Sequence, residues 1–299
     1  MAVSEEALIV ATGSEGAGAR LFGYLFDTNA VVELPVGAEE AGSPDVEGRL
    51  AVWVEWDYDD SGRPADPGVY GYLLPRGPKV EIVGPERGAG YPQIAGGLVT
   101  WVEGAPLETN EELLRAPIFG VRVDDRGMPA GPIESLVPSV VVNTMADSMW
   151  TYGLSERYVV WEQSIADGGF AAGVHLLDLA TRETRLLSED GWLPSVWDGT
   201  VVFRTDTLMA LDLGTGNSWT LDPDGTLPSA APTFAAYYRS GARDFEVVAL
   251  GYRGNKEQIL AAQGLPYWFS PSIAVSPTYI ALATEDYRVR LFRWQGGEQ

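Results

Sequence analysis

Residues 49–56 read RLAVWVEW, a short apolar strand centred on a tryptophan, and this pattern recurs along the chain. The copies are spaced by 34 to 60 residues, with a mean of about 45, and a propeller blade repeats roughly every 40–50 residues. Seven copies are present: ALIVATG from Ala7, RLAVWVEW from Arg49, LVTWVEG from Leu98, YVVWEQ from Tyr158, TVVFRT from Thr200, FAAYYR from Phe234 and YIALATE from Tyr279.

The segments around each copy repeat in phase with it. A short proline-containing segment precedes the aromatic strand, as in SPDVEG, YPQIAG, LPSVWDG and LPSAAP, and two further strands follow it, as in GVHLLDL and ETRLLS. Four short strands per unit, joined by polar turns, describe one propeller blade. The repeat therefore predicts an all-β protein, a single β-propeller domain over residues 1–299 with four-stranded antiparallel blades.

The number of copies favours seven blades, and six blades is the alternative if the first and last copies merge. The first copy lacks an obvious inner strand, and the last copy lacks an outer one. A propeller ring closes when the two ends of the chain complete one blade between them. Residues 1–6 are therefore expected to supply the outer strand of the last blade.

The large aromatic residues of the repeated strand are predicted to lie in the core. Neighbouring blades pack face to face, and a flat ring fills the gap between them. Trp53, Trp101 and Trp161 are therefore interpreted as packing residues and not as a platform for a ligand.

Composition limits the kinds of partner. The chain carries 42 Asp and Glu against 20 Lys and Arg, a formal net charge of -22. Such a surface repels phosphate backbones and anionic lipids, so we expect no nucleic acid and favour a basic protein or a divalent ion. There is no cysteine, which excludes disulfides and thiol catalysis. The N-terminal stretch has no apolar run long enough for a signal or an anchor, so no direct membrane insertion of this segment is expected.

The repeat resembles that of the TolB-like β-propellers, in which a proline-led inner strand precedes a VVW-like strand and then a YDLxTG-like strand and turn. The stretches SPDVEGRLAVWVEW, YPQIAGGLVTWVEG and VHLLDLATRETRLL carry the resemblance, which extends over most of residues 7–294; the SPDG turn of that family is not found. The resemblance implies a bacterial or archaeal scaffold that binds a protein partner outside the cytoplasm, in the periplasm or at the cell surface. A cytoplasmic location stays open.

The longest insertions fall in blades two to four, in loops that share one face of a propeller. Loops held by a rigid scaffold are where binding usually resides, so we expect this acidic face to contact the partner. Within blade three, TNEELLR from Thr109 has the form of a capping box and predicts one or two helical turns. The candidate contact residues are Asp59, Glu108, Glu111, Glu112, Asp147, Trp150, Tyr152 and Phe170.

The stretch DYDDSG in blade two begins like a calcium loop, with Asp57, Asp59 and Ser61 as possible ligands of Ca²⁺. The twelfth position, where such a loop needs a bidentate carboxylate, is Gly68. The segment DDSGRPA is closely matched by DDRGMPA from Asp124 at a different position between strands. The match favours ordinary turn chemistry, and the calcium site is the alternative; no other cofactor is indicated.

Catalysis has little support in the sequence. The single histidine, His175, lies in an apolar strand and is predicted to be packed, and no GxSxG, P-loop or HExxH motif is present. Carboxylate pairs remain as an enzymatic route, with Asp45, Asp147 and Asp198 as candidates. A non-catalytic scaffold for protein–protein interaction is therefore favoured, and a propeller glycoside hydrolase or polysaccharide lyase is the alternative.

Overall fold

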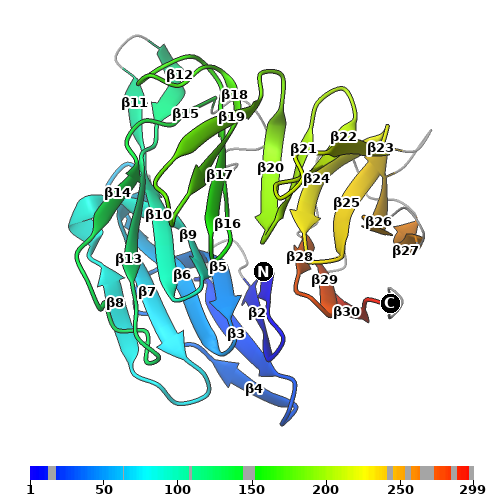
Figure 1. Ribbon diagram of the computed structural model, residues 1–299. Helices are drawn as coiled ribbons and strands as arrows, with labels where there is room; N and C mark the ends of the chain where they lie inside the picture. The colour runs from blue at the N-terminus through cyan, green and yellow to red at the C-terminus, as the bar shows by residue number, and fades with distance from the viewer. Residues whose placement is uncertain are drawn as a thin grey trace. The chain divides into compact units, whose positions relative to one another are not determined.

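The structure is a computed structural model, and its chain forms two compact units, Met1–Asp147 and Ser148–Gln299. It is an all-β protein of seven antiparallel blades, a β-propeller (Figure 1). The structure describes residues 1–12, 18–62, 64–107, 110–143, 152–240, 245–252, 257–262, 273–283 and 288–295.

The first unit holds blades one to three, each of four strands, and a short 3-10 helix at Pro85–Arg87. Blade one contains β1 (Ala2–Val3), β2 (Ala7–Thr12), β3 (Arg20–Leu25) and β4 (Ala30–Glu33). Blade two contains β5 (Glu40–Glu47), β6 (Leu50–Tyr58), β7 (Pro64–Leu73) and β8 (Lys79–Val83). Blade three contains β9 (Ala89–Ala95), β10 (Leu98–Glu103), β13 (Ile118–Arg122) and β14 (Glu134–Val137). An additional small sheet contains β11 (Ala105–Leu107), β12 (Asn110–Arg115) and β15 (Val141–Asn143).

The second unit holds blades four to seven. Blade four contains β16 (Tyr152–Leu154), β17 (Tyr158–Gln163), β18 (Gly173–Asp178) and β19 (Thr184–Ser188). Blade five contains β20 (Trp192–Trp197), β21 (Thr200–Arg204), β22 (Leu208–Asp212) and β23 (Ser218–Asp222). Blade six contains β24 (Gly225–Ala230), β25 (Phe234–Ser240), β26 (Phe245–Gly251) and β27 (Glu257–Ala262). Three strands of blade seven are described: β28 (Ile273–Val275), β29 (Tyr279–Ala283) and β30 (Val289–Arg293). Each of the seven repeated segments forms the second strand of its blade, as predicted.

The prediction for residues 1–6 is wrong, because β1 pairs antiparallel with β2 and is the inner strand of blade one. A serine makes this two-residue strand possible. The Ser4 hydroxyl accepts the N–H of Ala7 at 3.0 Å and donates to the carbonyl of Gly48 at 2.6 Å. Ser155 and Ser276 accept the corresponding N–H groups in blades four and seven, so one serine turn joins the first two strands of three blades. A hydroxyl that satisfies the turn allows the first strand to be very short.

The repeated tryptophans lie in the core, as predicted. Trp53, Trp101 and Trp161 each have 0% exposed surface. Trp53 packs with Ile9 and Leu21 of blade one, and Trp101 packs with residues of blade two such as Val52. Burying about 150–250 Å² per ring at roughly 25 cal/mol per Å² gives a transfer free energy of up to about 4–6 kcal/mol for each tryptophan.

The proline-led segment forms a bulge in the inner strand, directly opposite the aromatic residue. In blade two, Gly42 pairs with Val54 and Asp45 with Val52, so two inner residues face the single Trp53. The same shift occurs opposite the aromatic positions of blades three, five and six. In each bulge the residue before the proline has a positive φ, which is uncommon outside glycine. These residues are Ser43, Tyr91, Leu193 and Leu227, with φ of 46°, 53°, 52° and 49°.

The bulge also joins neighbouring blades. The Asp45 carboxylate accepts the N–H of Ile94 in the inner strand of blade three at 2.8 Å. In the second unit, the Ser195 hydroxyl accepts the N–H of Ala230 in the inner strand of blade six at 3.0 Å. Asp45 and Ser195 occupy the same place, directly after the proline, so the side chain there serves as an acceptor between blades.

Candidate functional site

The DYDDSG stretch forms the turn between β6 and β7. The Asp59 carboxylate accepts the N–H of Ser61 at 2.8 Å and its hydroxyl at 2.6 Å, and the N–H of Gly62 donates to the Asp59 carbonyl at 2.9 Å. Gly62 has φ of 77°, which explains the glycine at this position. The Asp57 carboxylate accepts the N–H of Glu39 at 2.9 Å. The Asp59 carboxylate thus binds the backbone of this turn, and the Asp57 carboxylate binds the backbone just before β5.

The DDRG segment has the same turn geometry at a different place in its blade. The Asp124 carboxylate accepts the N–H groups of Arg126 and Met128, both at 2.9 Å, and the N–H of Gly127 donates to the Asp124 carbonyl at 2.8 Å. These backbone hydrogen bonds lower the pKa of Asp124. The interpretation of the two matching segments as one kind of turn is confirmed. Within the part of the chain that the structure describes, no group of three or more His, Asp and Glu side chains is placed to hold a metal ion.

The blade-three insertion forms a strand hairpin, so the prediction of helical turns from Thr109 is wrong for Asn110–Arg115, which are β12. β12 pairs with β11 on one side and with β15, from the link to blade four, on the other. In Figure 1 these three strands lie together beyond the ends of β10 and β13. A helix of about six residues is marginal by itself, whereas β12 obtains ladder hydrogen bonds from two neighbours.

Two of the candidate contact residues lie in the small sheet of β11, β12 and β15. Glu111 and Glu112 lie in β12, its central strand. Leu113 pairs with Asn143, which joins two insertions that are separate in the sequence. Glu108, Asp147 and Trp150 lie outside the described residues.

The two aromatic candidates of blade four are both packed against the blade. Tyr152 is only 6% exposed in β16, so it is a core residue and not a surface anchor. Phe170 is half-buried and makes edge contacts with Trp161 at 5.3 Å and with His175 at 5.4 Å between ring centroids. Phe170 therefore supports the loop that carries it and presents only part of its ring to solvent.

His175 is a packed residue, as predicted, with 4% exposed surface. Its ring stacks on Trp161 with a centroid distance of 5.2 Å, and its Nε2–H donates to the carbonyl of Ala171 at 2.7 Å. Burial lowers the pKa of His175, so the ring stays neutral near pH 7. These contacts hold the blade-four loop in place.

An exposed surface next to blade four contains a tryptophan of the inner strand of blade five that the sequence interpretation missed. Trp192, at the start of β20, is 41% exposed, and Ile165 in the loop after β17 is 40% exposed. The N–H of Leu193 donates to the Glu162 carboxylate in β17 at 3.1 Å, which holds the start of β20 against the end of β17. We define the blade-four patch as Ile165, Asp167, Phe170, Glu189, Asp190 and Trp192. The run SED directly before Gly191 and Trp192 is the only sequence signal for it.

Buried carboxylates elsewhere have structural partners. Glu55, which is 3% exposed, accepts the Trp53 indole N–H at 2.8 Å and binds Lys79 at 2.7 Å. Glu103 in blade three likewise accepts the Trp101 indole N–H at 2.9 Å and binds Arg87 at 2.6 Å. In both blades a Trp-x-Glu pair of the second strand and a cation therefore form one bonded group.

Of the three carboxylates considered for catalysis, Asp45 has a strongly shifted pKa. Burial raises the pKa of Asp45 to about 6, while the N–H groups of Ile94 and Val46 bind its two oxygens and oppose the shift. Asp198 lies in the turn between β20 and β21 with φ of 43°, and Asp147 lies outside the described residues. The place of Asp45 between the inner strands of blades two and three therefore explains its burial and its raised pKa.

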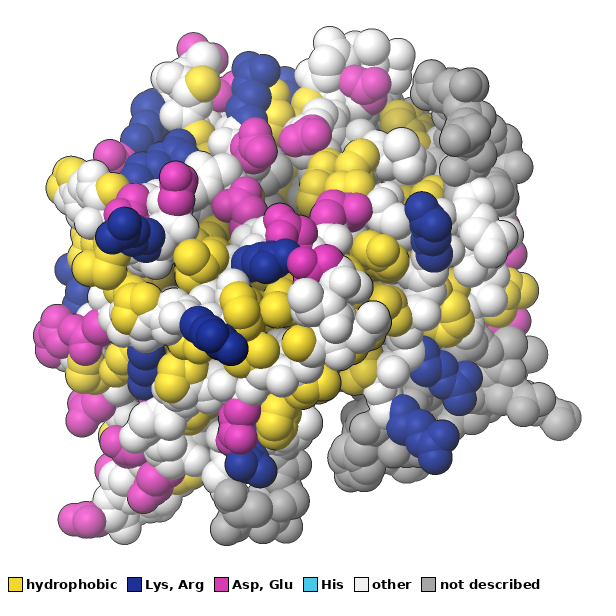
Figure 2. All heavy atoms as spheres, turned by 90° about the horizontal axis from the view of Figure 1, so that it is seen from below, with side chains coloured by type: hydrophobic (Ala, Val, Ile, Leu, Met, Phe, Trp, Pro, Cys, Tyr) yellow, Lys and Arg dark blue, Asp and Glu magenta, His cyan; other side chains and the backbone are white. Residues whose placement is uncertain are grey.

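Charge on the lower face is mixed. Figure 2 shows dark blue Lys and Arg side chains standing among the Asp and Glu side chains and the hydrophobic ones, so no single acidic field covers that face. Among the described residues there is no helix long and apolar enough to cross a membrane.

Comparison with known proteins shows likeness in structure and not in sequence. No family model matches the chain, and no curated protein matches its sequence. An oligogalacturonate lyase in complex with manganese aligns with a TM-score of 0.65 at 11% identity, over 96% of this chain and 85% of the lyase chain. The β-propeller domain of the Trilobed protease from Pyrococcus furiosus, described as having an open velcro topology, aligns with a TM-score of 0.60 at 11% identity, over 87% and 82%. TolB from Acinetobacter baumannii aligns with a TM-score of 0.50 at 12% identity, over 98% and 80%. The chain therefore has a TolB-like β-propeller fold, built here of seven blades.

Proposed function

We propose that this protein is a non-catalytic propeller scaffold that binds a protein partner through the elaborated loops of blades two to four. The observation that carries the proposal is the additional sheet of β11, β12 and β15, which is not part of any blade. A blade needs only a short turn between its second and third strands, as Thr205 and Asp206 provide in blade five. An ordered sheet in place of that turn adds surface that the propeller itself does not require.

The blade-four patch supports a protein partner. Interfaces are enriched in tryptophan, and an exposed indole is a common anchor because its large ring is ordered at little entropic cost. Trp192 has this character, and Glu189 and Asp190 next to it are exposed. An aromatic anchor beside carboxylates fits a partner segment that combines an apolar residue with Lys or Arg. We therefore propose a basic partner, in keeping with the net charge of -22.

The test is binding to a partner captured by crosslinking from the source organism and then purified. Its Kd is measured for the wild-type protein, for Trp192→Ala, for Glu189→Lys/Asp190→Lys and for Glu111→Lys/Glu112→Lys. We expect each variant to weaken binding by at least about tenfold, and rising salt to weaken the wild-type complex. Glu33→Lys, on the outer strand of blade one, is the matched control for charge reversal. Unchanged affinity in all three test variants would reject the proposed surface.

A second candidate is an enzyme that acts on an acidic polysaccharide, and the raised pKa of Asp45 on an inner strand is the observation that favours it. The fold is shared with the oligogalacturonate lyase. The test follows the unsaturated product of oligogalacturonate by ultraviolet absorbance, with and without Mn²⁺. Activity that Asp45→Asn abolishes without unfolding the protein would replace the scaffold proposal.

We further propose that the protein acts outside the cytoplasm, as the fold resemblance to TolB suggests. Cell fractionation, followed by detection of the native protein with an antibody, tests this location. Recovery with cytoplasmic marker enzymes would reject it.

A further inference from the structure

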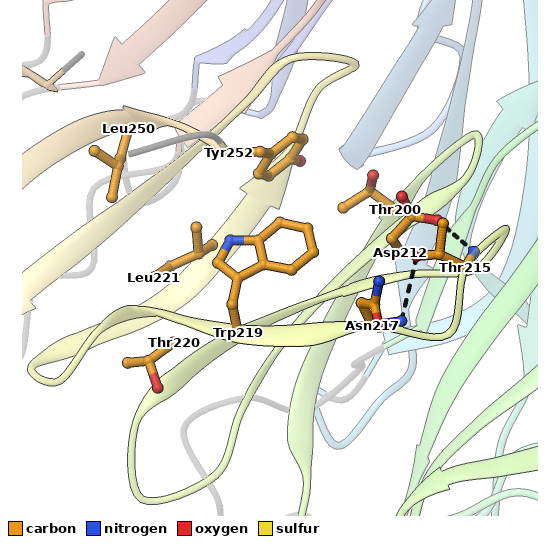
Figure 3. Close-up of a pocket in the computed structure, with 9 residues that line it drawn as sticks. All are labelled: Thr200, Asp212, Thr215, Asn217, Trp219, Thr220, Leu221, Leu250 and Tyr252. Atoms are coloured by element: carbon orange, nitrogen blue, oxygen red, sulfur yellow. Dashed lines mark hydrogen bonds between the residues drawn. The ribbon is translucent and has the colours of Figure 1, made fainter. Parts of the chain in front are cut away.

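A pocket with a volume of about 590 Å³ lies between blades five and six, outside the loops discussed above (Figure 3). Blade five contributes Thr200 from the start of β21, Asn217 from the turn after β22, and Trp219 from β23. Blade six contributes Leu250 and Tyr252 at the end of β26. The volume is within the range of small-molecule sites.

An aromatic pair forms the centre of the pocket. Trp219 and Tyr252 meet edge to face, with ring centroids 6.5 Å apart and an interplanar angle of 79°. Figure 3 shows the indole standing in the middle of the lining residues, with Leu221 and Leu250 on one side and Thr200 and Asn217 on the other. Both rings are half-buried and pack on the core of blades five and six. The pair offers an apolar surface that is fixed in orientation.

Several polar groups of the pocket form no hydrogen bond with the described residues. The indole N–H of Trp219 is buried and has no hydrogen-bond partner among the described residues. The Tyr252 hydroxyl, near the N–H of Ala231, also makes no hydrogen bond of normal geometry there. The side chains of Thr200 and Asn217 form no hydrogen bond to another described residue. Buried polar groups are almost always paired in folded proteins, so the unpaired Trp219 and Tyr252 groups indicate a ligand or bound water, while the half-buried Thr200 and the exposed Asn217 can be reached by a ligand at the rim.

The charge of the pocket limits that ligand. Of the residues that the structure describes, Asp212 is the only charged one that lines the pocket, and its carboxylate accepts the N–H groups of Gly214 at 2.8 Å and Thr215 at 2.9 Å. Among the described residues no Lys or Arg lines the pocket, so an anion such as a phosphate or a uronate would meet the Asp212 carboxylate without a balancing cation from this part of the chain. The ligand should therefore be neutral, with an apolar face for Trp219 and hydroxyl groups at its edge for Thr200 and Asn217.

A pyranose ring has this combination, because its C–H groups form an apolar face and its hydroxyls lie around the rim. We propose that the pocket between blades five and six binds a neutral sugar unit, with Trp219 as the stacking platform and Thr200 and Asn217 as hydrogen-bonding partners. This site is separate from the loops proposed to bind a protein, so either proposal can fail without the other.

The experiment is isothermal titration of the full chain with neutral tetrasaccharides (maltotetraose, cellotetraose, mannotetraose and xylotetraose) and with trigalacturonate as the anionic comparison. We expect at least one neutral sugar to bind with a Kd below about 1 mM, and trigalacturonate to bind more weakly. Trp219→Leu should weaken binding at least about tenfold, and Asn217→Ala about fivefold, as for the loss of one hydrogen bond.

Val31→Ala removes an apolar side chain that is 67% exposed on β4 of blade one, outside the pocket and outside the loops proposed to bind a protein, and should bind as the wild type does. Asn217 lies in an exposed turn, so Asn217→Ala keeps the test decisive if Trp219→Leu does not fold. The proposal would be overturned if no neutral sugar bound, or if trigalacturonate bound more tightly than the neutral sugars. It would also be overturned if Asn217→Ala and any folded Trp219 variant bound with unchanged affinity.

Discussion

Replacing Arg239 by methionine should destabilise the second unit strongly, because this guanidinium neutralises a buried carboxylate. Arg239 in β25 binds Asp222, at the end of β23 in blade five, at 2.6 Å, and Glu257 in β27 at 2.8 Å. The Asp222 side chain is 4% exposed, whereas that of Glu257 is 41% exposed. The two arms of the network should therefore contribute very unequally to stability.

The magnitude follows from this difference in burial. Leaving a buried charge without its partner costs about 3–5 kcal/mol, while an exposed ion pair contributes at most about 1 kcal/mol. Asp222 would keep the Tyr237 hydroxyl at 2.9 Å and the N–H of Asp224 at 2.8 Å, which places the cost at the lower end. We expect Arg239→Met to lower the free energy of unfolding by about 3 kcal/mol at pH 7, and the Tm by about 6–12 °C.

The pH dependence gives a second check. Burial raises the pKa of Asp222, but hydrogen bonds from the N–H of Asp224 and from Arg239 and Tyr237 outweigh it, so the net pKa lies below its usual range. A carboxyl with a depressed folded-state pKa adds stability above its unfolded pKa of about 3.9, and this stability is lost as the pH falls through the folded value. The difference between wild type and Arg239→Met should therefore be full at pH 7 and shrink below about pH 4.

Urea unfolding followed by tryptophan fluorescence, with calorimetry for Tm, measures both effects. Arg20→Met is the matched control, since the side chains of Arg20 and Glu33 are 61% and 48% exposed, and it should change stability by less than about 0.5 kcal/mol. A loss below about 1 kcal/mol in Arg239→Met at pH 7, or one equal to that of the control, would refute the reasoning.

Three further predictions concern the first unit. Burial raises the pKa of Asp45 to about 6, so the folded protein binds more protons than the unfolded chain between about pH 4 and 6. The free energy of unfolding should therefore fall by up to about 3 kcal/mol as the pH rises through this range. Urea unfolding should show this fall in the wild type and not in Asp45→Asn. Trp101→Leu removes a fully buried ring that also donates to Glu103, and calorimetry should show a loss of about 3–4 kcal/mol. Because the turn itself uses the Asp59 carboxylate, addition of Ca²⁺ after EDTA treatment should leave the Tm unchanged to within about 1 °C; a rise that disappears in Asp59→Ala would establish a metal loop.

The local repeat was sufficient to predict the architecture. Short apolar strands with a central aromatic residue, proline-led segments before them and polar turns after them identify a four-stranded unit, and all seven repeated segments form second strands. The burial of Trp53, Trp101 and Trp161 also follows from the sequence, because every blade must cover its neighbour with large apolar side chains.

Predictions failed where strand pairing, and not the local pattern, decides the structure. TNEELLR has a helix-start signal, yet β12 is a strand because β11 and β15 both pair with it. The inner strand of blade one is two residues long, too short for a pattern, and the Ser4 turn that supports it binds the carbonyl of Gly48 in the next blade. Tyr152 reads as a loop aromatic, but its pairing with Trp161 draws it into the core.

The sequence by itself determined the repeating unit and the aromatic core and favoured seven blades over six, because each depends on a few neighbouring residues and on the period at which they recur. Only the tertiary structure decided which polar side chains are satisfied. Asp45 binds an N–H of the next blade, Arg239 joins two blades through Asp222, and Trp219 shares a pocket with Tyr252 but has no partner for its N–H. Hydrogen bonding requires contact within about 3 Å, and contacts between blades arise only when segments of different blades pack together, as with Arg239 and Asp222, 17 residues apart, and Asp45 and Ile94, 49 residues apart.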